Sequence, residues 1–81
     1  MEHNKILEMM NEVFVDVFDD KDILIEDKTT ADDIEDWDSL AHLQLIMALE
    51  RRFNIQFNIS EIHSYANVGE MCDGIARHLN K

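Results

Sequence analysis

Apolar residues recur every three or four positions in the first part of the chain, which is the spacing of one face of an α-helix. Between Asn4 and about Val17 this apolar stripe consists of Ile6, Met10, Val13 and Val17. The polar positions in between are also four residues apart, at Glu8, Glu12 and Asp16. This pattern predicts an amphipathic helix over residues 4–17.

The next segment, from Asp19 to Asp38, contains few apolar residues and no helical stripe, so we predict an extended acidic loop. A loop of this length without structure of its own is uncommon in a compact domain. We therefore expect it to pack on the rest of the molecule through Leu24 and Ile34, or to contain a short turn of helix.

A second helix is predicted from Asp38 to about Phe53, because Asp before an apolar run is a favoured N-cap. Asn54 follows as a plausible C-cap. We expect a short helix over residues 60–64, opened by Ser60. A last helix is predicted over residues 67–79, with an apolar stripe of Val68, Met71, Cys72, Ile75 and Leu79 and with Asn67 and Glu70 spaced as in a capping box.

These elements predict an all-α fold: a small four-helix bundle of three main helices and one short helix, with a long first loop. The 81 residues leave room for one core, so we expect a single domain over residues 1–81. With two Gly and no Pro, the chain is poor in the residues that tight β-hairpins require.

The second helix carries more apolar surface than a half-buried helix needs. At 100° per residue, Leu45, Ile46, Leu49 and Phe53 form a core stripe, and a second arc beside it consists of Leu40, Leu43 and Met47. Together they cover roughly 220°, about twice the usual stripe. Either this helix is central and wrapped by the others, or the second arc is exposed and docks on partners or lines an acyl-chain groove.

The chain is strongly acidic, with a formal net charge of −11. Of its 18 acidic residues, 11 lie between Asp16 and Asp38. Such a charge disfavours nucleic acid and anionic membrane surfaces as partners, and no apolar run is long enough for membrane insertion. The acidic segment is either a solvated loop or a rim that attracts basic partners over a distance.

Cysteine and histidine usage indicates neither a disulfide framework nor a metal site. The single Cys72 indicates a reducing compartment and falls on an apolar stripe, so we expect an inert core thiol. The N-terminus has no signal-peptide core, and we expect a cytoplasmic monomer. The four histidines, His3, His42, His63 and His78, have no metal-ligand spacing and are expected at the surface or partly packed. Asp20 and Asp22 lack the glycine and closing Glu of a calcium loop.

The tripeptide Asp38-Ser39-Leu40 opens the second helix. A serine or aspartate at a helix start is usually a cap, and a serine nucleophile needs an oriented base. His42 lies three residues on, but no third group is evident to orient it, so we expect no catalytic site and no enzyme activity.

The wider stretch changes this picture. It comprises Asp36-Trp37-Asp38-Ser39-Leu40, then residues 43–50 (LQLIMALE), then Phe53-Asn54-Ile55, and it closely resembles the acyl carrier protein family. The resemblance extends upstream through the acidic loop and downstream to the last helix.

The resemblance implies a carrier role, with residues 1–81 as one acyl carrier domain. Ser39 would receive 4'-phosphopantetheine from coenzyme A through a separate phosphopantetheinyl transferase, and the thiol of this arm would carry acyl groups as thioesters. Asp38 would assist the transfer. The residues around the serine would contact the cargo and partners such as acyl-loading, condensing or acyltransferase enzymes with basic surfaces; these residues are Leu40, Leu43, Met47 and Trp37.

Several positions depart from the pattern of carriers that serve fatty acid synthesis. Ala41 follows Leu40 where an acid is usual, and Arg51-Arg52 interrupt the acidic end of the helix. Trp37 is more reminiscent of specialised carriers. We therefore expect a dedicated carrier for a specialised acyl, polyketide-like or aminoacyl pathway, although the sequence leaves the pathway and the acyl cargo open.

Two other functions compete with the carrier role. One is a non-covalent acidic adaptor that binds partners through its second helix. The other is a calcium-sensing bundle, which the missing loop ligands make the weakest alternative. Replacement of Ser39 by Ala would abolish the function of a carrier and barely affect an adaptor.

Overall fold

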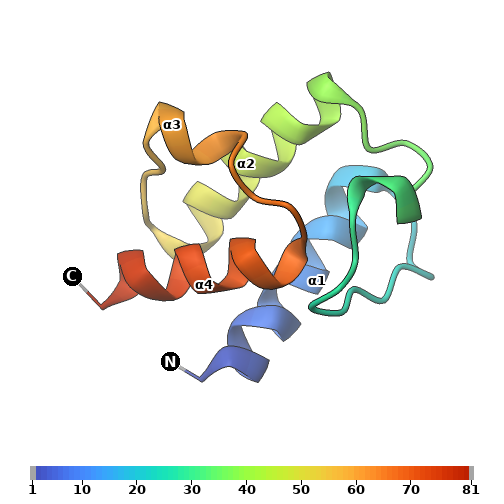
Figure 1. Ribbon diagram of the computed structural model, residues 1–81. Coiled ribbons are helices and arrows are strands. Elements are labelled where there is room, and N and C mark those ends of the chain that lie inside the picture. The colour runs from blue at the N-terminus through green and yellow to red at the C-terminus, as the bar shows by residue number, and fades with distance from the viewer. Residues whose placement is uncertain (1, 81) are drawn as a thin grey trace.

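The structure, a computed structural model, describes residues 2–80 and contains helices but no strands in that range (Figure 1). The long helices are α1 (His3–Phe18), α2 (Ser39–Phe53) and α4 (Val68–Leu79). A short helix, α3 (Ile59–Ile62), lies between α2 and α4, and a single 3₁₀ turn, η1 (Ala31–Asp33), interrupts the long first loop. The all-α fold with three main helices and one short helix is confirmed.

The core is formed where α1 packs against both α2 and α4. On α2, the stripe of Leu45, Ile46, Leu49 and Phe53 is between 0% and 6% exposed, as its spacing predicts. The largest fully buried side chains from the other helices are Ile6, Met10, Phe14, Met71 and Ile75. Burial of these apolar side chains stabilises the fold by about 1.5–3 kcal/mol each before the loss of chain entropy is counted.

The predicted caps of α2 and α4 are present. The Asp38 carboxylate accepts a hydrogen bond of 2.8 Å from the Ala41 amide, and Asn54 ends α2 in the left-handed region at φ 55°. The Asn67 side chain accepts from the Glu70 amide at 2.9 Å and caps α4.

The predicted start of the short helix is wrong. Helix α3 begins at Ile59 and ends at Ile62, so Ser60 lies inside the helix and does not open it. Asn58 is the N-cap: its side chain and that of Glu61 form a reciprocal capping box, in which Glu61 accepts from the Asn58 amide at 2.9 Å. Two amides gain partners in this arrangement, whereas a cap at Ser60 would satisfy one, and this favours the earlier start.

The long first loop is held on α1 by a side chain that the sequence pattern did not single out. The side-chain amide of Asn11 donates to the Ile23 carbonyl at 3.2 Å and accepts from the Ile25 amide at 2.8 Å. This pairing turns Ile23 and Ile25 toward the bundle. Leu24, between them, is 81% exposed, so the expected packing through Leu24 is wrong, whereas the alternative, a short turn of helix, is present as η1. Ile34 is partly buried against the core as expected.

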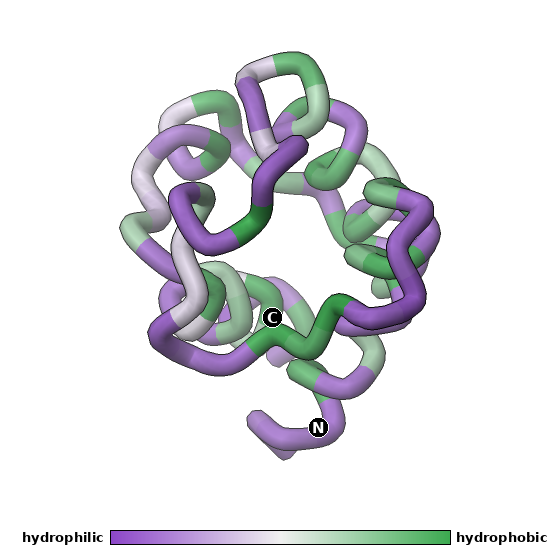
Figure 2. Tube along the Cα trace, turned by 90° about the vertical axis from the view of Figure 1, so that its right-hand side faces the viewer, coloured by the Kyte–Doolittle hydropathy of each residue, from purple (hydrophilic) through white to green (hydrophobic). Residues whose placement is uncertain are grey.

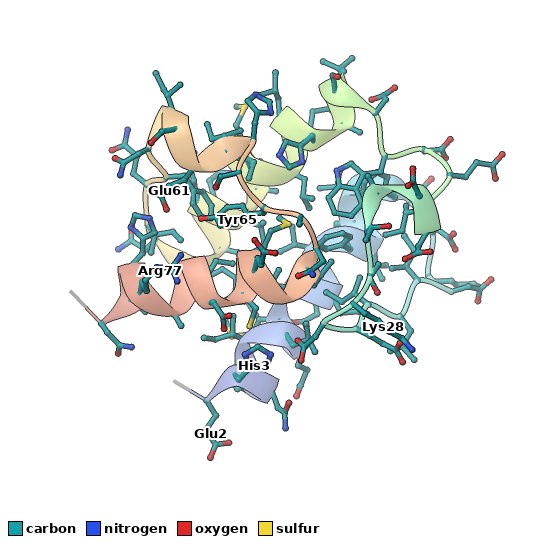
Figure 3. All side chains as sticks on the ribbon, in the orientation of Figure 1. Glu2, His3, Lys28, Glu61, Tyr65 and Arg77 are labelled. Atoms are coloured by element: carbon teal, nitrogen blue, oxygen red, sulfur yellow. The ribbon has the colours of Figure 1, made fainter. Side chains whose placement is uncertain are left out.

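The far end of the loop is joined to the start of α4. The amides of Val68 and Gly69 donate to the carbonyls of Thr29 and Asp27, each at 2.8 Å. A Cβ on Gly69 would lie 2.9 Å from that Asp27 oxygen, so this close approach requires glycine. His3 adds a side-chain contact of 2.6 Å to Asp27, which raises the pKa of the imidazole (His3 is labelled in Figure 3).

Figure 2 looks onto the side of the molecule where the loop lies, and shows a mainly hydrophilic trace with short hydrophobic stretches. Between residues 2 and 80, every helix is too short or too polar to cross a membrane.

Candidate functional site

Ser39 is the first residue of α2 and is exposed to solvent. Asp38 precedes it as N-cap, and the first backbone bond of the helix runs from the His42 amide to the Asp38 carbonyl at 2.8 Å. The amides of Ser39 and Leu40 belong to the first turn, where α-helix geometry leaves N–H groups without partners in the helix. These amides and the helix dipole favour a phosphate group at this position.

A cavity of about 360 Å³ opens beside Ser39. Its walls come from the end of the first loop, the first turn of α2, and the segment that connects α3 to α4. The lining residues with aromatic rings or a reactive hydroxyl are Trp37, Ser39, His42, His63 and Tyr65. A group attached to Ser39 would therefore have a hollow next to it.

Trp37 anchors the end of the loop against α1. Its ring meets that of Phe14 edge to face, with centroids 5.3 Å apart, and lies 6.2 Å from that of Phe18. Its position is half-buried. The indole also donates a hydrogen bond of 3.1 Å to Nδ1 of His42, which the sequence pattern did not predict.

His42 bridges the loop and α3. Its Nε2 lies 2.6 Å from the carbonyl oxygen of Ile62, which can only accept, so Nε2 carries the hydrogen. The indole of Trp37 can only donate, so Nδ1 is the acceptor. These two partners assign the neutral Nε2–H tautomer and occupy both ring nitrogens, so His42 is partly packed and does not act as a free base beside Ser39.

The second apolar arc of α2 is exposed. Leu40 is 67% exposed, Leu43 45% and Met47 56%, whereas the core stripe on the same helix is buried. Of the two explanations for the surplus apolar surface of α2, the structure supports an exposed face. Leu40, Leu43 and Met47 thus form a patch that begins next to Ser39, and we call these three residues the α2 patch.

Charge is arranged unevenly around this patch. Four acids in the last part of the first loop are exposed; they are Asp32, Asp33, Glu35 and Asp36. At the other end of α2, Arg52 forms an ion pair of 3.2 Å with Glu12 of α1, and Arg51 is exposed. A partner that approaches Ser39 along the patch meets negative charge on the loop side.

Glu61 of α3 contacts His78 of α4 and also Tyr65, which lines the cavity (Glu61 and Tyr65 are labelled in Figure 3). It accepts hydrogen bonds from the Asn58 amide and from the Tyr65 hydroxyl at 3.0 Å, and lies 2.9 Å from Nε2 of His78. The Asn58 amide is the main cause that lowers the pKa of Glu61 to about 2, with help from His78 and Tyr65. Burial and the Glu61 contact raise the pKa of Tyr65 to about 12. This cluster was not predicted from the sequence, although the spacing of Asn58 and Glu61, three residues apart as in a capping box, could have indicated it.

Cys72 is not part of the lining of the cavity beside Ser39. Cys72 is buried, as predicted, and burial raises the pKa of its thiol to about 11. Among the residues that the structure describes, no three His, Cys, Asp or Glu side chains gather in a way that could hold a metal ion.

Comparison with known proteins agrees with this geometry. The family model described as "Phosphopantetheine attachment site" matches residues 6–75. The solution NMR structure of a holo acyl carrier protein from Geobacter metallireducens has the same fold with a TM-score of 0.86. The two sequences are 38% identical, and the match covers 91% of this chain and 85% of that one. A search of curated proteins gives no significant match.

The residues present fit a phosphopantetheine group, because an exposed hydroxyl, a helix N-terminus and a neighbouring cavity meet at one place. The family match covers most of the chain and the solved neighbour shares its fold. The chain therefore belongs to the acyl carrier protein family, and its prosthetic group is 4'-phosphopantetheine.

Proposed function

We propose that Ser39 is the attachment site of the phosphopantetheine group and that the chain delivers acyl thioesters from this serine to separate enzymes. The observation that carries the proposal is the exposure of Ser39 at the N-terminus of α2, beside a cavity. When bound, the prosthetic group supplies a terminal thiol that forms thioesters with acyl groups. The chain itself supplies the position of this group and no catalytic residue.

Attachment requires a transferase, because His42 has both ring nitrogens occupied and does not activate the serine. In this step the Ser39 oxygen forms a bond to the phosphorus that bears pantetheine in coenzyme A. The bond from that phosphorus to the bridging oxygen of the pyrophosphate breaks, and adenosine 3',5'-bisphosphate leaves with that oxygen. The hydroxyl proton passes to a base of the transferase. Asp38 keeps the first turn of α2 formed while this happens, since it caps the helix.

The α2 patch and the acidic residues before it form the surface for the transferase and the acyl-handling enzymes. Leu and Met side chains adapt to different partner surfaces. The acidic segment favours partners with basic surfaces and speeds their approach. Both features lie next to Ser39, so a docked enzyme would have its active site near the arm.

We further propose that the pathway served is specialised and is not general fatty acid synthesis. This proposal rests on Ala41 beside the serine, on Arg51 and Arg52 at the end of α2, and on the Trp37–His42 pair at its start. General fatty-acid enzymes should therefore load and elongate this carrier at least about tenfold less efficiently than their own carrier. Equal efficiency would contradict the specialised role while leaving the carrier role intact.

Intact-mass measurement tests the attachment site. The protein is incubated with coenzyme A and a broad-specificity phosphopantetheinyl transferase, and a single phosphopantetheine addition is expected. Ser39→Ala should stay unmodified. Ser60→Ala, which removes another exposed helical serine, should be modified like the wild type. Folded wild-type protein that stays unmodified with several transferases would overturn the proposal and leave an adaptor that binds through the α2 patch.

A further inference from the structure

Three rings form a row along one wall of the cavity beside Ser39. The ring of His42 lies edge to edge with that of Trp37 through their hydrogen bond, with centroids 6.0 Å apart and planes only 19° from parallel, so the two rings form one nearly flat surface. The ring of His63 follows, 5.6 Å from His42 with an interplanar angle of 31°. We call these three residues the ring wall. They come from the loop, from α2 and from the end of α3, and all three line the cavity.

Two of the three rings of the ring wall are held in place by contacts with the rest of the fold. Trp37 is fixed by its edge-to-face contact with Phe14 and by its hydrogen bond to His42. His42 is fixed in turn by the carbonyl of Ile62. His63 follows α3 directly and is exposed, so the outer end of the row is open to solvent. A preorganised aromatic surface of this kind binds with a smaller entropy cost than a mobile one.

The interior of the bundle, in the part of the chain that the structure describes, is occupied by packed side chains. The side chains of α2 that face inward, Leu45 and Leu49, are fully buried, and Phe14 and Met71 pack in the same core. Interiors of this kind are close-packed, so an inserted chain would have to displace them. The cavity beside Ser39 lies at the small end of the range of ligand sites, which is roughly 300–1,000 Å³.

We propose that the ring wall is a binding site for a planar acyl group, aromatic or conjugated, carried on the arm of Ser39. This inference rests on the proposed attachment at Ser39 and names the class of cargo. Planar π-systems bind aromatic rings in offset-stacked or edge-to-face arrangements, which a saturated group of equal size cannot form. The Tyr65 hydroxyl, which donates to Glu61, can still accept a hydrogen bond from a polar substituent on such a cargo.

Two cargoes of nearly equal size and different shape test the proposal. Benzoyl and cyclohexanecarbonyl groups are loaded onto Ser39 from their coenzyme A thioesters by a transferase, and mass spectrometry confirms the addition. The rate of thioester cleavage by hydroxylamine is then measured and divided by the rate for the same thioester of free pantetheine. The carrier should slow cleavage of the benzoyl thioester about two- to tenfold more than that of the cyclohexanecarbonyl thioester, the range expected for an aromatic contact.

A second measurement locates the cargo. In NMR spectra, the benzoyl group should shift the ring protons of His63 and His42, and the cyclohexanecarbonyl group should leave them close to their positions in the protein with an unacylated arm. His63→Ala should remove most of the difference between the two cleavage rates. Ser60→Ala, an exposed change on α3 that lies outside the cavity lining, should preserve it.

The outcomes separate this inference from the carrier role. If neither thioester added to Ser39, the proposed attachment would be overturned, and the inference with it. Successful loading with equal protection of both cargoes, or with protection that His63→Ala does not change, would overturn the inference alone.

Discussion

The indole N–H of Trp37 donates to Nδ1 of His42 at 3.1 Å, and this bond joins the end of the long first loop to the first turn of α2. The same imidazole reaches the Ile62 carbonyl of α3 through Nε2. One residue thereby connects the three segments around Ser39. The loop, α2 and α3 keep their relative positions at the site because of this bridge.

Replacement of His42 by Ala should therefore loosen the site. The change leaves the Trp37 N–H and the Ile62 carbonyl without their partner, and an unsatisfied polar group of this kind costs about 1–3 kcal/mol. We expect the free energy of unfolding in urea to fall by about that amount. Trp37 is the single tryptophan of the chain, so its fluorescence emission should shift to longer wavelength as the indole ring becomes more exposed to solvent.

Gln44→Ala is the matched control, since Gln44 is exposed on the same helix. It should leave both the unfolding free energy and the fluorescence close to those of the wild type. An unchanged unfolding curve and unchanged emission in His42→Ala would show that the bridge does not hold the site together.

Local signals in the sequence predicted most of the fold. The helical spacing gave the three long helices, and Asp38, Asn54 and Asn67 each cap a helix end through contacts within a few residues in the chain. The prediction that loop residue Leu24 is packed was wrong because the orientation of the segment depends on Asn11, which is distant in sequence. Hydrophobicity alone could not tell which of three consecutive apolar residues faces outward.

The site was predictable only in part. The position of Ser39 followed from the start of α2, and the 100° spacing of helical residues singled out the apolar arc that forms the α2 patch. The contact of His42 with Trp37 and Ile62 was not predictable, because it depends on how the loop and α3 return to α2. The roles of the α2 patch and of Asp38 in partner contacts remain predictions.

Gly74 and Tyr65 provide a test in which two physical effects have opposite signs. Alanine is favoured over glycine inside a helix by about 1 kcal/mol. A Cβ at Gly74, however, would overlap the hydroxyl of Tyr65 and lie 2.8 Å from its Cζ. Gly74 is buried, and overpacking of this kind costs about 1–3 kcal/mol. We therefore expect Gly74→Ala to lower the melting temperature.

Tyr65→Phe in the Gly74→Ala background should recover part of the loss, because it removes the oxygen that the new methyl group meets. The double-mutant cycle, measured by urea denaturation, isolates this steric term from the lost Tyr65–Glu61 hydrogen bond. A Gly74→Ala protein more stable than the wild type would mean that helix propensity outweighs the contact.

The thiol of Cys72 should be unreactive toward thiol reagents in the folded carrier. Its side chain is fully buried, and burial raises the pKa of the thiol to about 11, so the reactive thiolate is scarce near neutral pH. With a thiol reagent at pH 8, the unmodified protein should react slowly, and only as it unfolds. Phosphopantetheine-loaded protein should show one rapid thiol from the arm.

The Ser39→Ala and Cys72→Ala variants assign these two thiols. After incubation with coenzyme A and transferase, Ser39→Ala should show no rapid thiol and Cys72→Ala should show one. A rapid reaction of the unmodified wild-type protein would contradict the buried, inert role of Cys72.

Glu61 should make the stability of the fold depend on pH in the acid range. Its pKa is lowered from 4.5 to about 2 in the folded protein, first by the Asn58 amide and then by His78 and Tyr65. A carboxyl group with a lowered folded pKa stabilises the native state above its unfolded pKa. This contribution is present above about pH 4.5 and is lost progressively as the pH falls toward 2.

Comparison of the wild type with Glu61→Gln, which keeps the size of the side chain and removes its charge, measures this effect. The difference between their melting temperatures should be largest near pH 6 and shrink as the pH is lowered to 2.5, because the wild-type carboxylate is then increasingly protonated in the unfolded chain. Glu70→Gln, at an exposed position on α4, should give a smaller difference over the same range. If the Glu61→Gln difference stayed constant from pH 6 to pH 2.5, the charge of Glu61 would not stabilise the junction of α3 and α4, and its capping bonds alone would explain the geometry.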